Sequence, residues 1–378
     1  MTASALRPPT ALDDPVGMRH AGRELLGLAL MDARNHLLAR LAQDDSAAGC
    51  RRAVEAAWYQ EHWIACHPQR SRGEACDDRA VRLAGLEPAT AHWRAGHAQP
   101  TPEQVRDYLA ATLEVTLDLL AGCAEDDTAL HFFRQSLLHE DRLCEAWDEA
   151  RRQGQPASRP QRETLWMPAQ RWQLGNSPGG YVPLLERWAH GVDVPAFEID
   201  AQPVNWSQFM EFAEDGGYDH AEWWSAEGWA WARAQGRRAP AHVEQLRGAV
   251  LLERGGSMQR AAAGQPVMHL TRHEAEAWCR WAGRRLPTEP EWELAACSAT
   301  SRGFVWGDVF EWVAGSSRPW PGGGVAVPGA LDHWPGTPAA VLRGASFATR
   351  ARWRHPKSRR FVAATSDALF CGFRSCAF

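Results

Sequence analysis

The N-terminal part of the chain carries apolar residues at helical spacing, with polar positions between them. Over 18–40 the apolar positions recur every three or four residues, and the same period returns over 52–66, as in amphipathic helices. The pattern predicts four helices, over 18–40, 52–66, 101–120 and 129–152. Because one long connection, 67–100, separates the second helix from the third, a four-helix bundle is the expected architecture.

The C-terminal part has a different pattern, in which short apolar runs are interrupted by glycine and proline. Two helices stand out, 205–214 and 271–282, and the second begins with Thr271 and Glu274 at the spacing of a capping box. The remaining elements are short, which predicts an irregular, loop-rich α+β domain. The expected organisation is a flexible N-terminus (1–17), a helical bundle (18–152), a linker (153–165) and the irregular domain (166–378).

Composition and charge narrow the class of protein. The 378 residues include 41 basic and 46 acidic side chains, for a formal net charge of −5, so a basic nucleic-acid-binding surface is not expected. No apolar run reaches the roughly 18 residues that a membrane span needs, and a cytoplasmic location is expected. The nine cysteines contain no CxxC pair, which predicts reduced thiols rather than a zinc or redox site.

The aromatic residues are distributed unevenly along the chain. There are 20 tryptophans against 4 tyrosines, and 16 of the tryptophans lie at Trp166 or beyond it. This asymmetry indicates two unlike domains, of which the second builds its core from aromatic residues.

Four blocks of the C-terminal part resemble a known family. They are WCRWAGRRLPTEPEWELAA (278–296), GDVFEW (307–312), RGASFATR (343–350) and GFRSCA (372–377). In this order they resemble the formylglycine-generating-enzyme, or sulfatase-modifying-factor, fold, which implies a C-type-lectin-like domain. The oxidase members of that fold carry a cysteine pair soon after the third block. Here the corresponding stretch, Phe347 to Trp353, has no cysteine, so formylglycine-generating activity is not expected.

With its helical part included, the chain resembles the ergothioneine-type sulfoxide synthases, and in particular their selenoneine synthase branch. The matching blocks are AGRELLGLALMDARNH (21–36), AWYQEHWIACHPQRSRGEAC (57–76), HFFRQSLLHED (131–141), WQLGNSPGGYV (172–182) and ERWAH (186–190). The resemblance implies a DinB-like bundle in which three histidines hold Fe(II). It also implies an O2-dependent reaction that places sulfur or selenium, from a thiol or a selenosugar, on the imidazole of hercynine, a trimethylated histidine betaine.

The family's metal-ligand pattern is altered at two of its three positions. An HxxxH motif places two imidazoles on one helical face, but the motif here runs from His139 to Leu143. The histidine that the family places on the second helix corresponds to Glu55. For an iron site, the resemblance therefore implies His139 and Glu55 as ligands, with His36 as the best candidate for the third.

Three interpretations of His139 stay open at this point. It is a ligand in a rebuilt Fe(II) site, or it belongs to a degenerate site that binds no metal, or it is a core histidine paired with a carboxylate such as Glu55. The loss of two ligands from one triad weakens a metal site. Leucine at 143 fills the space of the missing histidine with hydrocarbon, which is stabilising where no metal has to be bound.

Further candidates for substrate chemistry come from the same resemblance. The family's catalytic tyrosine lies in the long connection, where this chain has Trp93 and Arg94, so Arg94 takes that position. Aromatic faces attract a quaternary ammonium group, which makes Trp320 a candidate for binding the substrate's cation. Candidates for contacts with the carboxylate or sugar of the substrates are Arg343, Ser346, Thr349, Arg350 and Arg374.

Two functions follow from the sequence. The first is an iron-dependent synthase that joins sulfur or selenium to hercynine. The alternative is a catalytically degenerate paralogue that keeps the scaffold to bind a ligand or a partner protein. The synthase, and the paralogue in its ligand-binding form, imply a small-molecule ligand of the betaine class, and neither function implies a nucleic acid or a membrane as partner.

Overall fold

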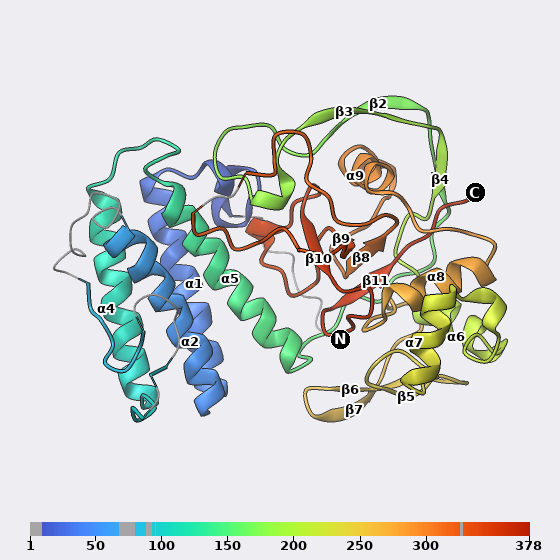
Figure 1. The fold of residues 1–378 in the computed structure, drawn as a ribbon, viewed down its shortest axis with the longest axis horizontal. Helices are drawn as coiled ribbons and strands as arrows, with labels where there is room; N and C mark the ends of the chain where they lie inside the picture. The colour runs from blue at the N-terminus through green and yellow to red at the C-terminus, as the bar shows by residue number, and fades with distance from the viewer. Residues whose placement is uncertain (1–9, 68–79, 88–92, 95, 326–327) are drawn as a thin grey trace.

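A computed structural model describes residues 10–67, 80–87, 93–94, 96–325 and 328–378 of the chain. Figure 1 shows four long helices lying side by side, next to a region of short strands and short helices. The last long helix runs from the other three toward the central sheet of that region. It is therefore the element that joins the two parts of the molecule.

The long helices lie where the apolar period predicts them. They are α1 (Arg23–Gln43), α2 (Ala47–Gln60), α4 (Pro102–Ala121) and α5 (His131–Ala150). Two 3-10 turns, η1 (Ala11–Asp13) and η2 (Gly17–His20), precede α1, so part of the stretch that was expected to be flexible (1–17) is regular. Residues 1–9 and much of the long connection lie outside the described residues.

Helix α2 does not stop at its last α-helical residue. It continues as a π-helical segment, η3 (Glu61–Cys66), which changes the rotation of the side chains that follow. Such segments are rare and occur often at functional sites. The segment lies directly beside the pocket described below.

The C-terminal region is built around a four-stranded sheet of order β10-β9-β8-β11, in which β8 and β11 are parallel and the other pairs antiparallel. Its strands are β8 (Phe310–Val313), β9 (Ala340–Arg343), β10 (Arg359–Val362) and β11 (Cys371–Phe373). There are also two-stranded sheets of β1 (Leu165–Met167) with β4 (Phe197–Ile199) and of β2 (Gln170–Leu174) with β3 (His190–Val194). A three-stranded sheet contains β5 (Val243–Gln245), β6 (Leu251–Arg254) and β7 (Ser257–Arg260) in this order.

Four α-helices, rather than the two expected, belong to this region among the described residues. Helices α6 (Trp206–Glu214) and α8 (Arg272–Trp281) confirm the prediction, and α8 has the expected capping box of Thr271 and Glu274. Helices α7 (Ala226–Ala234) and α9 (Glu289–Ser298) were not predicted. Helix α9 also starts with a capping box, made by Thr288 and Glu291, but it is buried on most sides and so lacks an amphipathic period.

Tryptophan forms much of the core around these short elements. Trp206, Trp292 and Trp312 are fully buried, and Phe209 and Phe373 belong to the same core cluster as Trp206 and Trp312. Large aromatic side chains bury much apolar surface per residue, which suits a region with few long elements. The aromatic core expected from the composition is therefore present.

The helices and the cysteines bear on two further expectations from the sequence. None of the helices in the described ranges has both the length and the apolar character that crossing a membrane requires. The eight cysteines in the described part of the chain are all free thiols.

Candidate functional site

A pocket of about 530 Å³ lies between α2 and α5 and is bounded by the segment 329–333 of the C-terminal region. Helix α2 and its π-helical continuation contribute Glu55, Trp58, Tyr59 and Trp63. Positions 55 and 59 are four residues apart, so their side chains share one helical face. Helix α5 contributes His139, Arg142 and Leu143, which share a face for the same reason.

His139 and Glu55 face each other across this pocket. The His139 Nε2 atom lies 3.6 Å from Glu55 Oε1, a separation suited to an ion pair but longer than a hydrogen bond. The interpretation of His139 as a core histidine paired with Glu55 requires this proximity. The Glu55 side chain is 47% exposed, against 12% for His139, so the carboxylate is the more accessible group of the two.

Tyr59 holds the imidazole of His139 in place. The two rings stack with centroids 4.0 Å apart and planes 19° apart. Burial raises the pKa of the Tyr59 phenol well above its usual range, so the hydroxyl stays protonated and can donate a hydrogen bond. The Nδ1 atom of His139 is buried and has no hydrogen-bond partner within the described residues. The ring is thus fixed by stacking rather than by a hydrogen bond.

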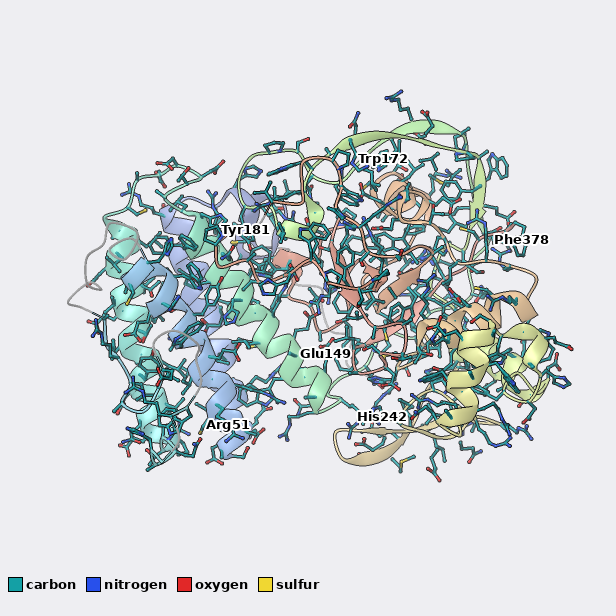
Figure 2. All side chains as sticks on the ribbon, viewed as in Figure 1. Arg51, Glu149, Trp172, Tyr181, His242 and Phe378 are labelled. Carbon is teal, nitrogen blue, oxygen red and sulfur yellow. The ribbon has the colours of Figure 1, made fainter. Side chains whose placement is uncertain are left out.

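The segment 329–333 is fastened to both helices. The Tyr59 hydroxyl donates to the Gly329 carbonyl at 2.5 Å, and the Gln135 amide donates to the same oxygen at 2.6 Å. The Gln135 side chain also accepts a 3.4 Å hydrogen bond from Tyr181, a residue of the C-terminal part (Figure 2). Arg142 adds an ion pair with Asp332 at 3.0 Å. These contacts make one wall of the pocket from a distant part of the chain.

The side chains of this pocket do not match a three-ligand iron site. Glu55, His139 and His333 line the pocket and bring one carboxylate and two imidazoles to its walls, the donor types that an oxygen-activating iron site takes. Throughout the described ranges, no three His, Cys, Asp or Glu side chains are grouped so that they could hold a metal ion. The donor types are therefore present around the pocket, but the described side chains are not grouped closely enough to form a metal site.

Neither of the two remaining metal and catalytic candidates lines the pocket. Burial, together with Arg350 and Arg40, lowers the pKa of His36, and this histidine is not among the pocket-lining residues. Arg94 pairs with Glu87 at 2.7 Å in an exposed position. The structure therefore brings Glu55 and His139 together but places His36 and Arg94 elsewhere.

Two of the arginines expected to contact substrate are fully buried in ion pairs. Arg343 contacts Glu289 at 3.2 Å and Glu293 at 2.5 Å. Arg374 donates two hydrogen bonds to Glu311, at 2.5 and 2.8 Å. Both guanidinium groups are therefore engaged by carboxylates of the protein. Arg343 ties α9 to the rest of the region, and Arg374 does the same for β8.

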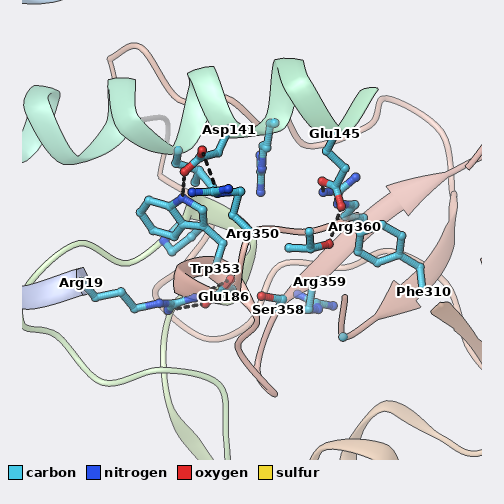
Figure 3. Close-up of a pocket in the computed structure, with 15 residues that line it drawn as sticks. Arg19, Asp141, Glu145, Glu186, Phe310, Arg350, Trp353, Ser358, Arg359 and Arg360 are labelled. Carbon is cyan, nitrogen blue, oxygen red and sulfur yellow. Dashed lines mark hydrogen bonds and ion pairs between the residues drawn. The ribbon is translucent and has the colours of Figure 1, made fainter. Parts of the chain in front are cut away.

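Three further candidates lie where the C-terminal region meets α5 and α1. Ser346 and Thr349 donate hydrogen bonds to Glu145 of α5, and Arg350 pairs with Asp32 of α1. Figure 3 shows this contact zone, with Arg350, Trp353 and Arg360 facing the acidic side chains of α5. The cavity enclosed there measures about 30 Å³, room for one or two water molecules and too small for a betaine.

Trp320, the candidate for binding a quaternary ammonium group, is 3% exposed. The guanidinium of Arg359 lies over its ring at 3.9 Å from the centroid. The cation on this aromatic face is therefore a side chain of the protein itself. Trp312 and Trp353 are buried as well.

Sequence reasoning missed the residues that hold the pocket together. Tyr59, Gln135 and Gly329 were not candidates, although Tyr59 follows Glu55 by four residues on the same helix and could have been found from that spacing. Gly329 contacts positions 270 residues away on α2 and 194 residues away on α5, and no local sequence pattern predicts such contacts.

Comparisons with known proteins assign this chain to a family. The model of the sulfatase-modifying factor enzyme 1-like domain matches residues 150–308. The hercynine oxygenase of Mycobacterium tuberculosis (strain ATCC 25618 / H37Rv) is 30% identical over 359 residues, which cover 77% of this chain and 82% of the relative. The chain belongs to the hercynine oxygenase family. The resemblance to the ergothioneine-type synthases, with their formylglycine-generating-enzyme domain, is thereby confirmed.

Another family member and a solved structure complete the comparison. The hercynine oxygenase of Mycolicibacterium smegmatis (strain ATCC 700084 / mc(2)155) is 30% identical over 344 residues, or 72% of this chain and 77% of that relative. The structure of PvdO from Pseudomonas aeruginosa matches with a TM-score of 0.35 and 16% identity, over 56% of this chain and 93% of that chain.

Proposed function

We propose that this member of the hercynine oxygenase family binds hercynine, or a closely similar betaine, in the pocket between α2 and α5. The observation that carries the proposal is the pocket itself, because His139 faces it at the position where the family's motif begins. Its volume of about 530 Å³ lies within the usual range for small-molecule sites. The relatives named hercynine oxygenase support a betaine as the ligand class.

The walls of the pocket suit a cationic ligand. Trp58, Tyr59 and Trp63 contribute aromatic rings, and Glu55 contributes a carboxylate with almost half of its side chain exposed. Aromatic rings and carboxylates both attract a quaternary ammonium group, which cannot donate hydrogen bonds. Because no three His, Cys, Asp or Glu side chains of the described residues are grouped closely enough to hold the family's iron, we assign ligand binding rather than oxygen chemistry to this pocket.

A calorimetric titration tests the proposal directly. Full-length protein is treated with a chelator, dialysed and titrated with hercynine. We expect saturable binding of one hercynine per chain that is unchanged by added Fe(II). Trp63→Leu, at the pocket, should weaken binding, whereas Trp166→Leu, at a position 60% exposed on the C-terminal region, should not. Undetectable binding of hercynine by the folded protein would refute the proposal.

The second candidate function is the O2-dependent formation of a C–S or C–Se bond on hercynine, with a thiol or a selenosugar as donor. It is favoured by the buried Nδ1 of His139, which lacks a hydrogen-bond partner among the described residues and is thus an imidazole nitrogen left without a protein contact. Fe(II) bound here would need a ligand beyond Glu55 and His139.

Metal analysis separates the two candidates. Protein purified from iron-supplemented cells is analysed for iron, together with the His139→Ala variant, and oxygen consumption is followed with hercynine and a thiol. For a ligand-binding paralogue we expect substoichiometric iron, equal in both proteins, and no hercynine-dependent oxygen consumption. One iron per chain that is lost in His139→Ala would instead establish the synthase.

We also propose the domain division expected from the sequence. In this proposal a DinB-like helical bundle (18–152) and the sulfatase-modifying-factor domain (166–378) are joined by the linker 153–165. The ligand pocket then lies between the two domains, because α2 and α5 form two of its walls and the segment 329–333 forms the third.

A further inference from the structure

The pocket between α2 and α5 contains one arginine whose hydrogen-bonding capacity is partly unused. Arg142 lines the pocket and is 23% exposed. Its Nη1 atom donates to both carboxylate oxygens of Asp332, at 3.0 and 3.1 Å. Within the described residues, its Nε and Nη2 atoms donate no hydrogen bond. A guanidinium carries five N–H donors in a fixed plane, so this arginine retains donors for a ligand.

We propose that Arg142 binds the carboxylate of the ligand and makes the pocket selective for a betaine over a simple quaternary ammonium compound. This inference rests on the proposed function, because it concerns the same pocket and the same ligand class. It assigns the carboxylate to a residue that sequence reasoning did not consider.

The position of Arg142 on α5 fits this role. It follows His139 by three residues, so the two side chains lie on one face about one helical turn apart, a rise of roughly 5 Å. A histidine betaine separates its imidazole from its carboxylate by a comparable length. The ligand can therefore place its ring beside His139 and its carboxylate beside Arg142 at the same time.

The other arginines proposed from the sequence cannot take the carboxylate without losing a partner. Arg343 and Arg374 are fully buried against glutamates, and Arg350 is paired with Asp32 outside the pocket. Among the described residues that line the pocket, Arg142 is the one arginine. An arginine held by one carboxylate through Nη1 presents its remaining edge in the geometry that binds a second carboxylate.

The pocket also separates its charged groups. Glu55 is on α2, whereas Arg142 is on α5 and is held from the far side by Asp332 of the segment 329–333. Hercynine carries its trimethylammonium and carboxylate groups on one carbon, so the end of the ligand that Arg142 binds also carries the cation, while the imidazole ring lies at the other end, beside His139. A plain quaternary ammonium compound would leave the donors of Arg142 without a partner in the filled pocket.

The test removes one partner of the contact at a time, either the carboxylate of the ligand or the guanidinium of Arg142. Wild-type protein is titrated with hercynine and with hercynine methyl ester, which keeps the ring and the trimethylammonium group. We expect hercynine to bind about tenfold or more tightly, as for a charge-assisted, bidentate contact. In Arg142→Gln the preference should disappear because hercynine weakens to the level of the ester, and in Arg142→Lys part of it should return.

Asp332→Asn is the matched control, since it removes the ion pair that Arg142→Gln also breaks. It should keep the preference for hercynine over the ester. A folded Arg142→Gln variant that still prefers hercynine, or a wild-type protein that binds both compounds equally, would overturn the inference while leaving the proposed function intact. If neither compound binds, the proposed function fails and the inference fails with it.

Discussion

Glu149, near the C-terminal end of α5, is a buried acid in an unfavourable environment (Figure 2). Burial and, to a smaller extent, the neighbouring Glu145 raise the pKa of its carboxyl to about 8, against the opposing effect of Arg360. The Oε1 atom has no hydrogen-bond partner in the described part of the chain. The folded protein therefore holds a neutral carboxyl here at neutral pH.

This carboxyl makes stability depend on pH. In the unfolded chain it ionises near its ordinary pKa of 4.5, whereas in the folded protein it ionises near 8. Its contribution to stability is thus complete below about pH 4.5 and is lost as the pH rises to about 8, by about 1.4 kcal/mol per pH unit at most. Denaturant titrations between pH 4.5 and 8 should show this loss for the wild type and a flatter profile for Glu149→Gln.

The matched control is Glu114→Gln, at an exposed position on α4. It should follow the wild-type profile. If Glu149→Gln and the wild type have parallel profiles over this range, Glu149 is ionised in the folded protein and the account of its environment is wrong.

At the scale of single residues, the sequence predicted local features better than it predicted which side chains contact each other across the fold. The capping residues Thr271 and Glu274 were readable because both ends of the motif lie within one helical turn. The proximity of Glu55 and His139 was anticipated because the resemblance placed both at metal-ligand positions. The ion pairs of Arg343 and Arg374 were not, since their partners lie 50 or more residues away in the chain.

Among the elements, the segment 329–333 determines the shape of the pocket. Gly329 has a φ of +69°, and a Cβ atom there would lie 2.8 Å from Gln135 Nε2 and 2.9 Å from the Trp63 ring. Glycine is therefore required both by the backbone conformation and by the closeness of α2 and α5.

Gly329→Ala should accordingly displace the segment from the two helices. We expect a loss of about 1–3 kcal/mol in the free energy of unfolding, together with weaker binding of hercynine. Gly248→Ala is the control, because Gly248 has a φ of +65° but no atom within 4 Å of a Cβ. It carries the backbone strain alone and should leave hercynine affinity unchanged. If both variants change hercynine affinity equally, the segment 329–333 is not part of the binding site.

Elements were predictable where one face is apolar and the other polar. Helices α1, α4 and α5 have such a period or a strong start signal, and each was found within a few residues. Helix α9 was missed despite the capping box of Thr288 and Glu291, because its surroundings bury it on most sides. The π-helical continuation of α2 depends on tertiary packing and has no sequence signal of its own.

In the whole molecule, one buried arginine connects the helices to the C-terminal region. Arg352 is 1% exposed and donates to Asp141 of α5 at 2.6 and 2.9 Å and to Asp32 of α1 at 2.7 Å. Trp353 donates a further hydrogen bond to Asp141 at 2.7 Å. Figure 3 shows this carboxylate beside Trp353 and Arg350. Removal of the arginine would leave two carboxylates without their main partner.

Arg352→Met should therefore weaken the coupling between the two parts. Removing one partner of a buried pair costs about 3–5 kcal/mol, so thermal unfolding should begin earlier and separate into two transitions, one for each part. Arg247→Met, at an exposed position, should unfold like the wild type. A single unshifted transition in Arg352→Met would show that other contacts hold the parts together.

The central claim is that a betaine binds between α2 and α5, beside Glu55 and His139. A crystal structure of the chelator-treated protein with hercynine tests it most directly. The account predicts density for hercynine in this pocket, with its carboxylate on Arg142 and no metal between its ring and His139. Hercynine bound instead among the C-terminal loops, or through a metal ion held by His139, would contradict the account.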